Sequence, residues 1–191
     1  YSENHIKCRY CHSLYVSGRR TYSDRSSFFH EVLKYQKQYN KKNIAVYNAI
    51  QTNGYLIDEN WCRFLHEHHF LVGLSVDGTE ETHNSLRHDK NGQGTFSRVL
   101  NAAALMKRFK VDYNILTVVT PDIAREVKSV YSYYKKQNWL YQQYIACLDP
   151  LGEGHGKTPY ALTPELYGQF LIDLFDLWYQ DCLKGTAPYI R

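Results

Sequence analysis

Apolar and polar positions alternate along the chain in a way that predicts strands and helices in turn. Short apolar runs at residues 44–51, 71–76, 114–119 and 144–147 predict strands. Apolar residues at helical spacing predict helices that begin at Ser26, after Asp58, at Thr95, after Pro121 and at Thr163–Pro164. Because buried strands and helices follow each other in this order, the sequence predicts an α/β fold with a parallel sheet.

Two of the predicted strands run into a polar tetrad that ends in glycine. The tetrads are Gln51-Thr52-Asn53-Gly54 and Ser75-Val76-Asp77-Gly78. The carboxyl ends of parallel strands share one face, where α/β folds place cofactors, so these polar side chains are candidate ligand contacts. Each tetrad alone is better explained as a turn, because Asn-Gly and Asp-Gly favour turns. Two tetrads on adjacent strands shift the balance toward a site.

Arg87 and His83 follow the second tetrad, in a predicted loop. The guanidinium of Arg87 could clamp a carboxylate with two parallel hydrogen bonds. On its own, a solvated loop arginine is the simpler interpretation. For His83 the sequence suggests no partner.

Composition excludes several classes of function. The 191 residues include 43% apolar and 22% charged residues, which is ordinary for a globular protein with one core. The net charge of +4 is dispersed, and no basic stripe predicts a nucleic-acid partner. Since no apolar run approaches the roughly 20 residues of a membrane span, no membrane association is expected.

The cysteines indicate thiols or metal ligands instead of disulfides. There are 5 of them, an odd number that is widely spread, which predicts a cytoplasmic protein. Cys8 and Cys11 are separated by two residues and could hold one iron or zinc ion together. Two thiolates do not complete a four-ligand site, so zinc-ribbon and thioredoxin interpretations are weak.

With these residues the chain resembles the radical S-adenosylmethionine (SAM) enzymes, and among them the anaerobic sulfatase-maturating enzymes. The resemblance covers residues 42–191 and is strongest in IQTNGYLIDENW, FLVGLSVDG, DYNILTVVTPDIAREV and ACLDPL. It implies one domain over residues 1–191, a partial (βα)6 barrel of parallel strands with outer helices. It also implies two cofactors, a four-iron, four-sulfur (4Fe-4S) cluster and SAM.

The resemblance assigns roles to particular residues, though it identifies no catalytic one. Cys8 and Cys11 match the second and third cysteines of the cluster loop. The positions that match the family's SAM contacts are Gln51, Thr52 and Asn53 at a strand end, Ser75, Asp77 and Arg87 around the ribose and carboxylate, and Leu148 beside the adenosyl group.

The implied chemistry is radical oxidation of a sulfatase. An electron donor such as a flavodoxin or ferredoxin reduces the cluster, which splits SAM into methionine and a 5′-deoxyadenosyl radical. The radical removes a hydrogen from a sulfatase Cys or Ser, and oxidation to formylglycine follows. The protein fixes geometry and excludes water, while the cofactors supply the chemistry.

Three departures from the family pattern predict weak or absent cluster binding and no turnover by this polypeptide. Asn4 stands where the family has its first cluster cysteine, and an amide is a poor iron–sulfur ligand. The segment around 12–26 is too short for the family's Gly-Gly-Glu strand together with a helix. The auxiliary-cluster domain would begin after Arg191 and is expected to be absent.

Two alternative functions therefore remain. One is a catalytically silent α/β scaffold or fragment descended from radical SAM enzymes, which Asn4 and the shortened segment favour. The other is a zinc module that uses Cys8 and Cys11 with His5 or His12. It ranks last because loop histidines are more often unligated.

Overall fold

The computed structural model describes residues 12–17, 26–148 and 160–191. In these ranges six parallel strands form one sheet in the order β1-β2-β3-β4-β5-β6. The strands are β1 (His12–Ser17), β2 (Val46–Thr52), β3 (Leu71–Ser75), β4 (Tyr113–Val119), β5 (Tyr141–Ala146) and β6 (Tyr189–Ile190). The predicted parallel α/β sheet is confirmed.

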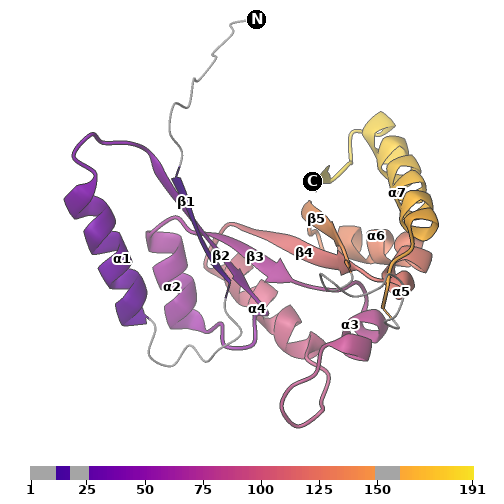
Figure 1. The fold of residues 1–191 in the computed structure, drawn as a ribbon, viewed down its shortest axis with the longest axis horizontal. Coiled ribbons are helices and arrows are strands. Elements are labelled where there is room, and N and C mark those ends of the chain that lie inside the picture. The colour runs from indigo at the N-terminus through magenta and orange to yellow at the C-terminus, as the bar shows by residue number, and fades with distance from the viewer. Residues whose placement is uncertain (1–11, 18–25, 149–159) are drawn as a thin grey trace, which may run out of the picture.

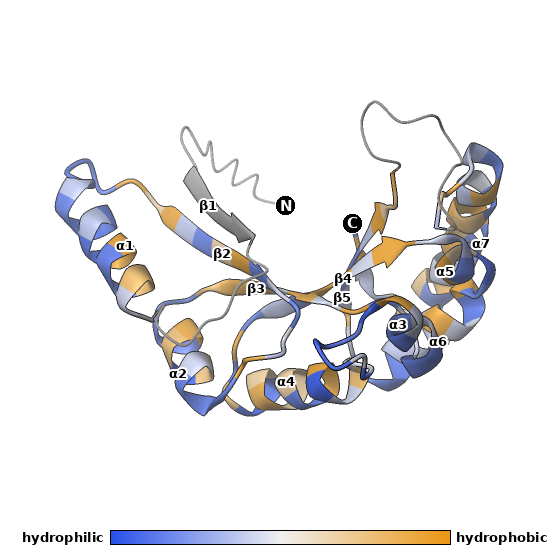
Figure 2. Cartoon of the chain, turned by 60° about the horizontal axis from the view of Figure 1, so that its bottom comes forward, coloured by the Kyte–Doolittle hydropathy of each residue, from blue (hydrophilic) through white to orange (hydrophobic). Residues whose placement is uncertain are grey.

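The helices lie along the outer, convex side of a curved and open sheet (Figure 1; Figure 2). They are α1 (Ser26–Tyr39), α2 (Glu59–Glu67), α3 (Glu80–Leu86), α4 (Phe96–Arg108), α5 (Pro121–Arg125), α6 (Val127–Lys136) and α7 (Pro164–Leu183). The architecture is a partial barrel, as expected. In the described ranges we find no helix with the length and apolar character of a membrane span.

Polar caps fix where several helices begin. Asp58 caps α2, where its Oδ1 accepts a hydrogen bond from the Trp61 N–H at 2.8 Å. Thr163 caps α7 by accepting from the Leu166 N–H at 3.2 Å. Each bond satisfies a backbone donor that the first helical turn would leave unpaired. The helix starts predicted at Asp58 and Thr163 are confirmed.

Three elements were not predicted from the sequence. Helix α3 is polar except for its last residue, Leu86, so it lacks an apolar period, and β6 has only 2 residues at the sheet edge. Strand β1 pairs with β2 along its whole length. The short segment between Cys11 and Ser26 therefore holds a strand over His12–Ser17, and residues 18–25 lie outside the described ranges.

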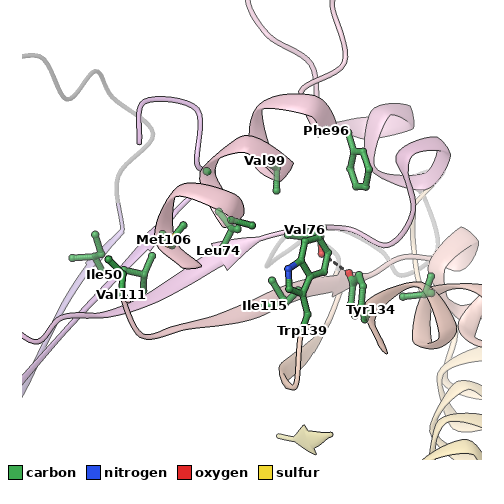
Figure 3. Packing of buried hydrophobic residues seen from close by; sticks show 14 of the residues in the cluster. Ile50, Leu74, Val76, Phe96, Val99, Met106, Val111, Ile115, Tyr134 and Trp139 are labelled. Carbon is green, nitrogen blue, oxygen red and sulfur yellow. Dashed lines mark hydrogen bonds between the residues drawn. The ribbon is translucent and has the colours of Figure 1, made fainter. Parts of the chain in front are cut away.

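The core lies between the sheet and the helices. Leu74 of β3 is fully buried and faces Val99 and Met106 of α4, both of which are also buried (Figure 3). Burying one such side chain stabilises the fold by roughly 1.5–3 kcal/mol. This packing supports the carboxyl end of β3, where the second polar tetrad begins.

Candidate functional site

The two polar tetrads open from the same edge of the sheet. Thr52, the last residue of β2, pairs with Leu74 of β3, and Ser75 ends β3 one residue later. Since both strands run in the same direction, the residues that follow them emerge side by side. The structure thus brings together the two tetrads that the sequence placed at one face.

The first tetrad forms a compact turn. Thr52 is buried, and its Oγ1 accepts a hydrogen bond from the Gly54 N–H at 3.1 Å. The Asn53 Oδ1 accepts from the Tyr55 N–H at 3.1 Å. The turn interpretation therefore accounts for both side chains. Gln51 differs, because its amide has no hydrogen-bond partner in the described part of the chain.

In the second tetrad a buried carboxylate links β3 to β4. Asp77 is 4% exposed, and its Oδ1 accepts a hydrogen bond from the Val118 N–H at 2.9 Å. Its Oδ2 forms an ion pair with the Nε of Arg87. Both oxygens are therefore committed to the protein, which makes Asp77 an anchor for Arg87 at the end of the sheet.

Gly78 makes this anchor possible through its backbone conformation. Its φ is +82°, and a Cβ at this position would lie 2.4 Å from Thr82 Oγ1. Its N–H donates to the buried hydroxyl of Tyr134 at 2.8 Å. A residue with a side chain could not hold the chain in this path without displacing its neighbours.

Arg87 presents a partly accessible cation at the strand ends. It caps the carboxyl end of α3, and its side chain is 28% exposed. Only Nε is bonded to Asp77, and the described residues give the two terminal nitrogens no hydrogen-bond partner. These nitrogens form the planar fork that binds a carboxylate or phosphate in two places.

His83 is a site residue that sequence reasoning missed. It is fully buried in α3, where its Nδ1 accepts a hydrogen bond from the Asp77 N–H at 3.1 Å. Its Nε2 lies 3.1 Å from the Oγ1 of Thr95. Burial lowers the pKa of His83 to about 4, outweighing the opposite effect of Asp77, so the ring is neutral at pH 7.

The start of α3 is the sequence feature that could have identified His83 as a site residue. The Thr79 N–H donates to Thr82 Oγ1 at 2.9 Å, as in a capping box. Thr82 stands where capping boxes usually carry Glu or Gln, which hid the helix start. Once α3 is recognised, His83 lies inside the helix and Arg87, four residues later, caps its carboxyl end.

A row of amide side chains crosses the inner, concave face of the sheet. Gln51 lies opposite Gly73, which lies opposite Asn114 on β4. Apart from the half-buried Tyr113, their chain neighbours are buried on the helix side, so this row faces the concave side. A Cβ on Gly73 would lie 2.5 Å from the Leu116 Cδ1, so the missing side chain makes room for that leucine.

A second row lies nearer the carboxyl ends. Ser75 is opposite Leu116, which is opposite Gln143 on β5. Like Gln51 and Asn114, the side chains of Ser75 and Gln143 are half-buried and have no hydrogen-bond partner in the described ranges. Asn114 and Gln143 were not predicted as site residues, because only the strand register shows that they share a face with Gln51 and Ser75.

The other residues predicted for the site are Leu148, Cys8 and Cys11, and only Leu148 lies in the described part of the chain. Leu148 follows β5 at the same edge of the sheet and is 83% exposed. Cys8 and Cys11 lie outside the described residues, so their role as cluster ligands stays a prediction. Across the ranges that are described, no group of three His, Cys, Asp or Glu residues is arranged to hold a metal ion.

Several curated proteins are similar to the chain over most of its length. A cysteine-type anaerobic sulfatase-maturating enzyme of Clostridium perfringens (strain 13 / Type A) is 51% identical over 164 residues, 86% of this chain and 44% of that protein. A serine-type enzyme of Klebsiella aerogenes is 32% identical over 86% of this chain and 40% of its own length. The chain thus spans less than half the length of these two relatives. No protein-family model matches it.

Solved structures agree with this similarity. Native anSMEcpe with bound AdoMet (SAM) and Kp18Cys peptide superposes with a TM-score of 0.90 at 47% identity, covering 95% of this chain and 50% of that one. Streptococcus suis SuiB, at 12% identity and a TM-score of 0.57, shares the fold alone.

Proposed function

The chain belongs to the radical SAM family and is related to the anaerobic sulfatase-maturating enzymes, and on that premise we propose that it is the barrel of an oxidoreductase. The proposed reaction oxidises a sulfatase Cys or Ser to formylglycine. The proposal is supported by 51% identity to a cysteine-type enzyme, against 32% to a serine-type enzyme. This difference favours Cys as the target residue.

SAM would bind at the carboxyl ends of β2 and β3. The terminal nitrogens of Arg87 suit its carboxylate, and Gln51 and Ser75 offer donors and acceptors for its amino group and ribose. Leu148 is an exposed apolar side chain that would cover the adenosyl group. When bound beside a reduced 4Fe-4S cluster, SAM supplies the radical chemistry that removes hydrogen from an unactivated carbon.

The protein's own residues would bind and orient the cofactor and the peptide. Asp77 holds the Arg87 guanidinium in place before SAM arrives, so less side-chain entropy is lost on binding. Asn114 and Gln143 carry a donor and an acceptor each, as a peptide group does, and would face a polypeptide in the concave side. Cys8 and Cys11 would hold the cluster.

The other partners follow from the same proposal. Reduction of the cluster requires a one-electron donor of the flavodoxin or ferredoxin class. The thiols of Cys62 and Cys182, which form no disulfide in the described part of the chain, support a reducing, cytoplasmic location. The dispersed charge of +4 supports neither a nucleic-acid nor a membrane partner.

The observation that carries this proposal is the accessible Arg87 fork on a buried Asp77 anchor. Titration of the 191-residue chain with SAM in a calorimeter tests it. We expect Arg87→Ala to weaken SAM binding about tenfold or more, because a charge-assisted pair is lost. Arg125→Ala, which removes an exposed arginine paired with Asp122, is the matched control.

Two outcomes would contradict the proposal. Equal SAM affinity in Arg87→Ala and the wild type would remove this residue from the cofactor site. A wild-type chain that does not bind SAM at millimolar concentration would favour the alternative, a catalytically silent scaffold of radical SAM origin.

A further inference from the structure

Asp77 and Arg87 are connected by two separate routes. Their side chains form the ion pair described above. A second route runs through the backbone of both residues: the Asp77 N–H meets His83 Nδ1 at 3.1 Å, and His83 Nε2 meets Thr95 Oγ1 at 3.1 Å. Thr95 Oγ1 then donates to the carbonyl of Arg87 at 3.3 Å. Together the two routes close a ring.

The direction of every hydrogen bond in this ring is determined. A backbone N–H can only donate, so Nδ1 of His83 must carry a lone pair instead of a proton. A neutral imidazole then has its proton on Nε2, which donates to Thr95. A carbonyl can only accept, so the Thr95 hydroxyl donates to Arg87. Each donor in the second route therefore meets an acceptor.

We propose that His83, as the neutral Nε2–H tautomer, is a positioning residue that fixes the Arg87 guanidinium for anion binding. It does so by tying the backbone of Arg87, through Thr95, to the backbone of its own anchor Asp77. The inference rests on the proposed function only for the identity of the anion, the SAM carboxylate. The hydrogen-bonded ring that joins Asp77 and Arg87 does not depend on which anion binds.

The surroundings of His83 keep its imidazole neutral. Its side chain is fully buried, and its edge packs on Phe96 with ring centroids 5.4 Å apart. The charged groups that act on it are Asp77 and Arg87, which oppose each other. A proton on Nδ1 would face the Asp77 N–H, donor against donor, and would break the second route.

The ring also explains why a polar helix precedes Arg87. His83 lies inside α3, Arg87 caps the carboxyl end of that helix, and Thr95 stands just before α4. The Thr95 N–H donates to the Arg87 carbonyl at 3.2 Å, which adds a second contact at the same point. The segment between α3 and α4 is therefore tied back onto the end of β3.

Nuclear magnetic resonance of the 15N-labelled 191-residue chain tests the inference. Two readouts are needed: the protonation of the two His83 ring nitrogens, and hydrogen exchange at the Arg87 Nε–H. Thr95→Val removes the hydroxyl at nearly constant volume, and His83→Leu removes the imidazole. His83→Asn restores an acceptor near the Nδ1 position. Tyr131→Phe removes a buried hydrogen bond to Asp181 elsewhere and is the control.

We expect a protonated Nε2 and an unprotonated Nδ1 at pH 7. Thr95→Val and His83→Leu should each speed exchange at Arg87 Nε about fivefold or more, the effect of losing one buried hydrogen bond. His83→Asn should recover part of the protection, and Tyr131→Phe should leave it unchanged. If His83→Leu does not fold, Thr95→Val carries the test.

A proton on Nδ1, or unchanged Arg87 exchange in Thr95→Val, would overturn the inference. An equal loss of protection in Tyr131→Phe would do the same, because the effect would then reflect general loosening. SAM titrated into the same samples separates the two proposals. A wild-type chain that shows the ring but does not bind SAM would contradict the proposed function and not the positioning role.

Discussion

At the residue scale, the site depends on a few buried polar groups whose partners are all specified. The carboxylate of Asp77 has partners in β4 and in Arg87, and each ring nitrogen of His83 has a hydrogen-bond partner. Buried groups of this kind are costly when a partner is removed, because water cannot replace it. Small substitutions should therefore have large effects here.

Asp77→Asn tests the anchor. The amide oxygen can still accept from the Val118 N–H, but the negative charge facing Arg87 is lost. We expect the free energy of unfolding to fall by about 2 kcal/mol, because a partly buried cation loses its partner. Urea denaturation measures the change. Glu31→Gln, which removes an exposed pair with Lys34, is the control and should change little.

Acid should destabilise the protein through His83. Its pKa is 6.5 when exposed and about 4 in the folded chain. Below pH 6.5 the unfolded chain therefore binds a proton that the folded chain does not. Stability is full above pH 6.5 and falls toward pH 4, by about 3 kcal/mol from this group.

Urea denaturation between pH 4 and pH 7 measures this effect. The wild type should lose stability steadily across the window. His83→Asn, which has no titrating ring, should show a smaller pH dependence in the same window. Parallel curves for the two proteins would show that His83 is not the group responsible.

At the element scale, regular patterns were predicted and irregular ones were not. The strand ending at Thr52 and the helix capped by Asp58 carry apolar periods, so local sequence was sufficient. Helix α3 has no apolar period, because it is held by capping and by His83 instead of a hydrophobic face. The bond between Asp77 and Val118 joins residues 41 apart, so only the strand register places them together.

Two glycines allow a matched test of the turn after β3. In Gly78→Ala the new Cβ would meet Thr82 Oγ1 at 2.4 Å and Ile123 Cδ1 at 2.7 Å, with φ at +82°. We expect a loss of about 2 kcal/mol or more.

Gly168→Ala is the control for that substitution. Gly168 lies inside α7, where an added Cβ has no neighbour within 4 Å. The change should stabilise the protein by up to about 1 kcal/mol, because alanine favours helices. Thermal denaturation of both variants decides the point, and a harmless Gly78→Ala would show that the turn tolerates another path.

At the scale of the whole molecule, the sequence was enough for the parallel sheet and for the edge where the site lies. The strand ends that carry Gln51 and Ser75 were predicted, because they are visible in the apolar pattern. That these residues, Asp77 and Arg87 bind a cofactor stays a prediction. The partners of His83 and the inner position of Asn114 required the assembled sheet. Position along the chain does not show which side chains face each other across strands.

Cluster loading is the prediction that belongs to this scale. With Asn4 in place of a third thiolate, the chain should bind little iron after anaerobic reconstitution. Asn4→Cys should raise the iron content toward four atoms per chain, the number in a 4Fe-4S cluster. Iron analysis and visible absorption measure it. Cys11→Ser in the Asn4→Cys background should abolish the gain, and iron retained there would exclude Cys11 as a ligand.

The order of the strands in the sheet matches their order in the sequence. Each new strand therefore adds beside the one made just before it, and no strand must wait for a distant partner. Such a sheet can assemble from the amino end while the chain is still being synthesised, one strand and helix at a time. The site would then mature stepwise: the first tetrad is set when β3 joins β2, and Asp77 gains its last partner only when β4 arrives.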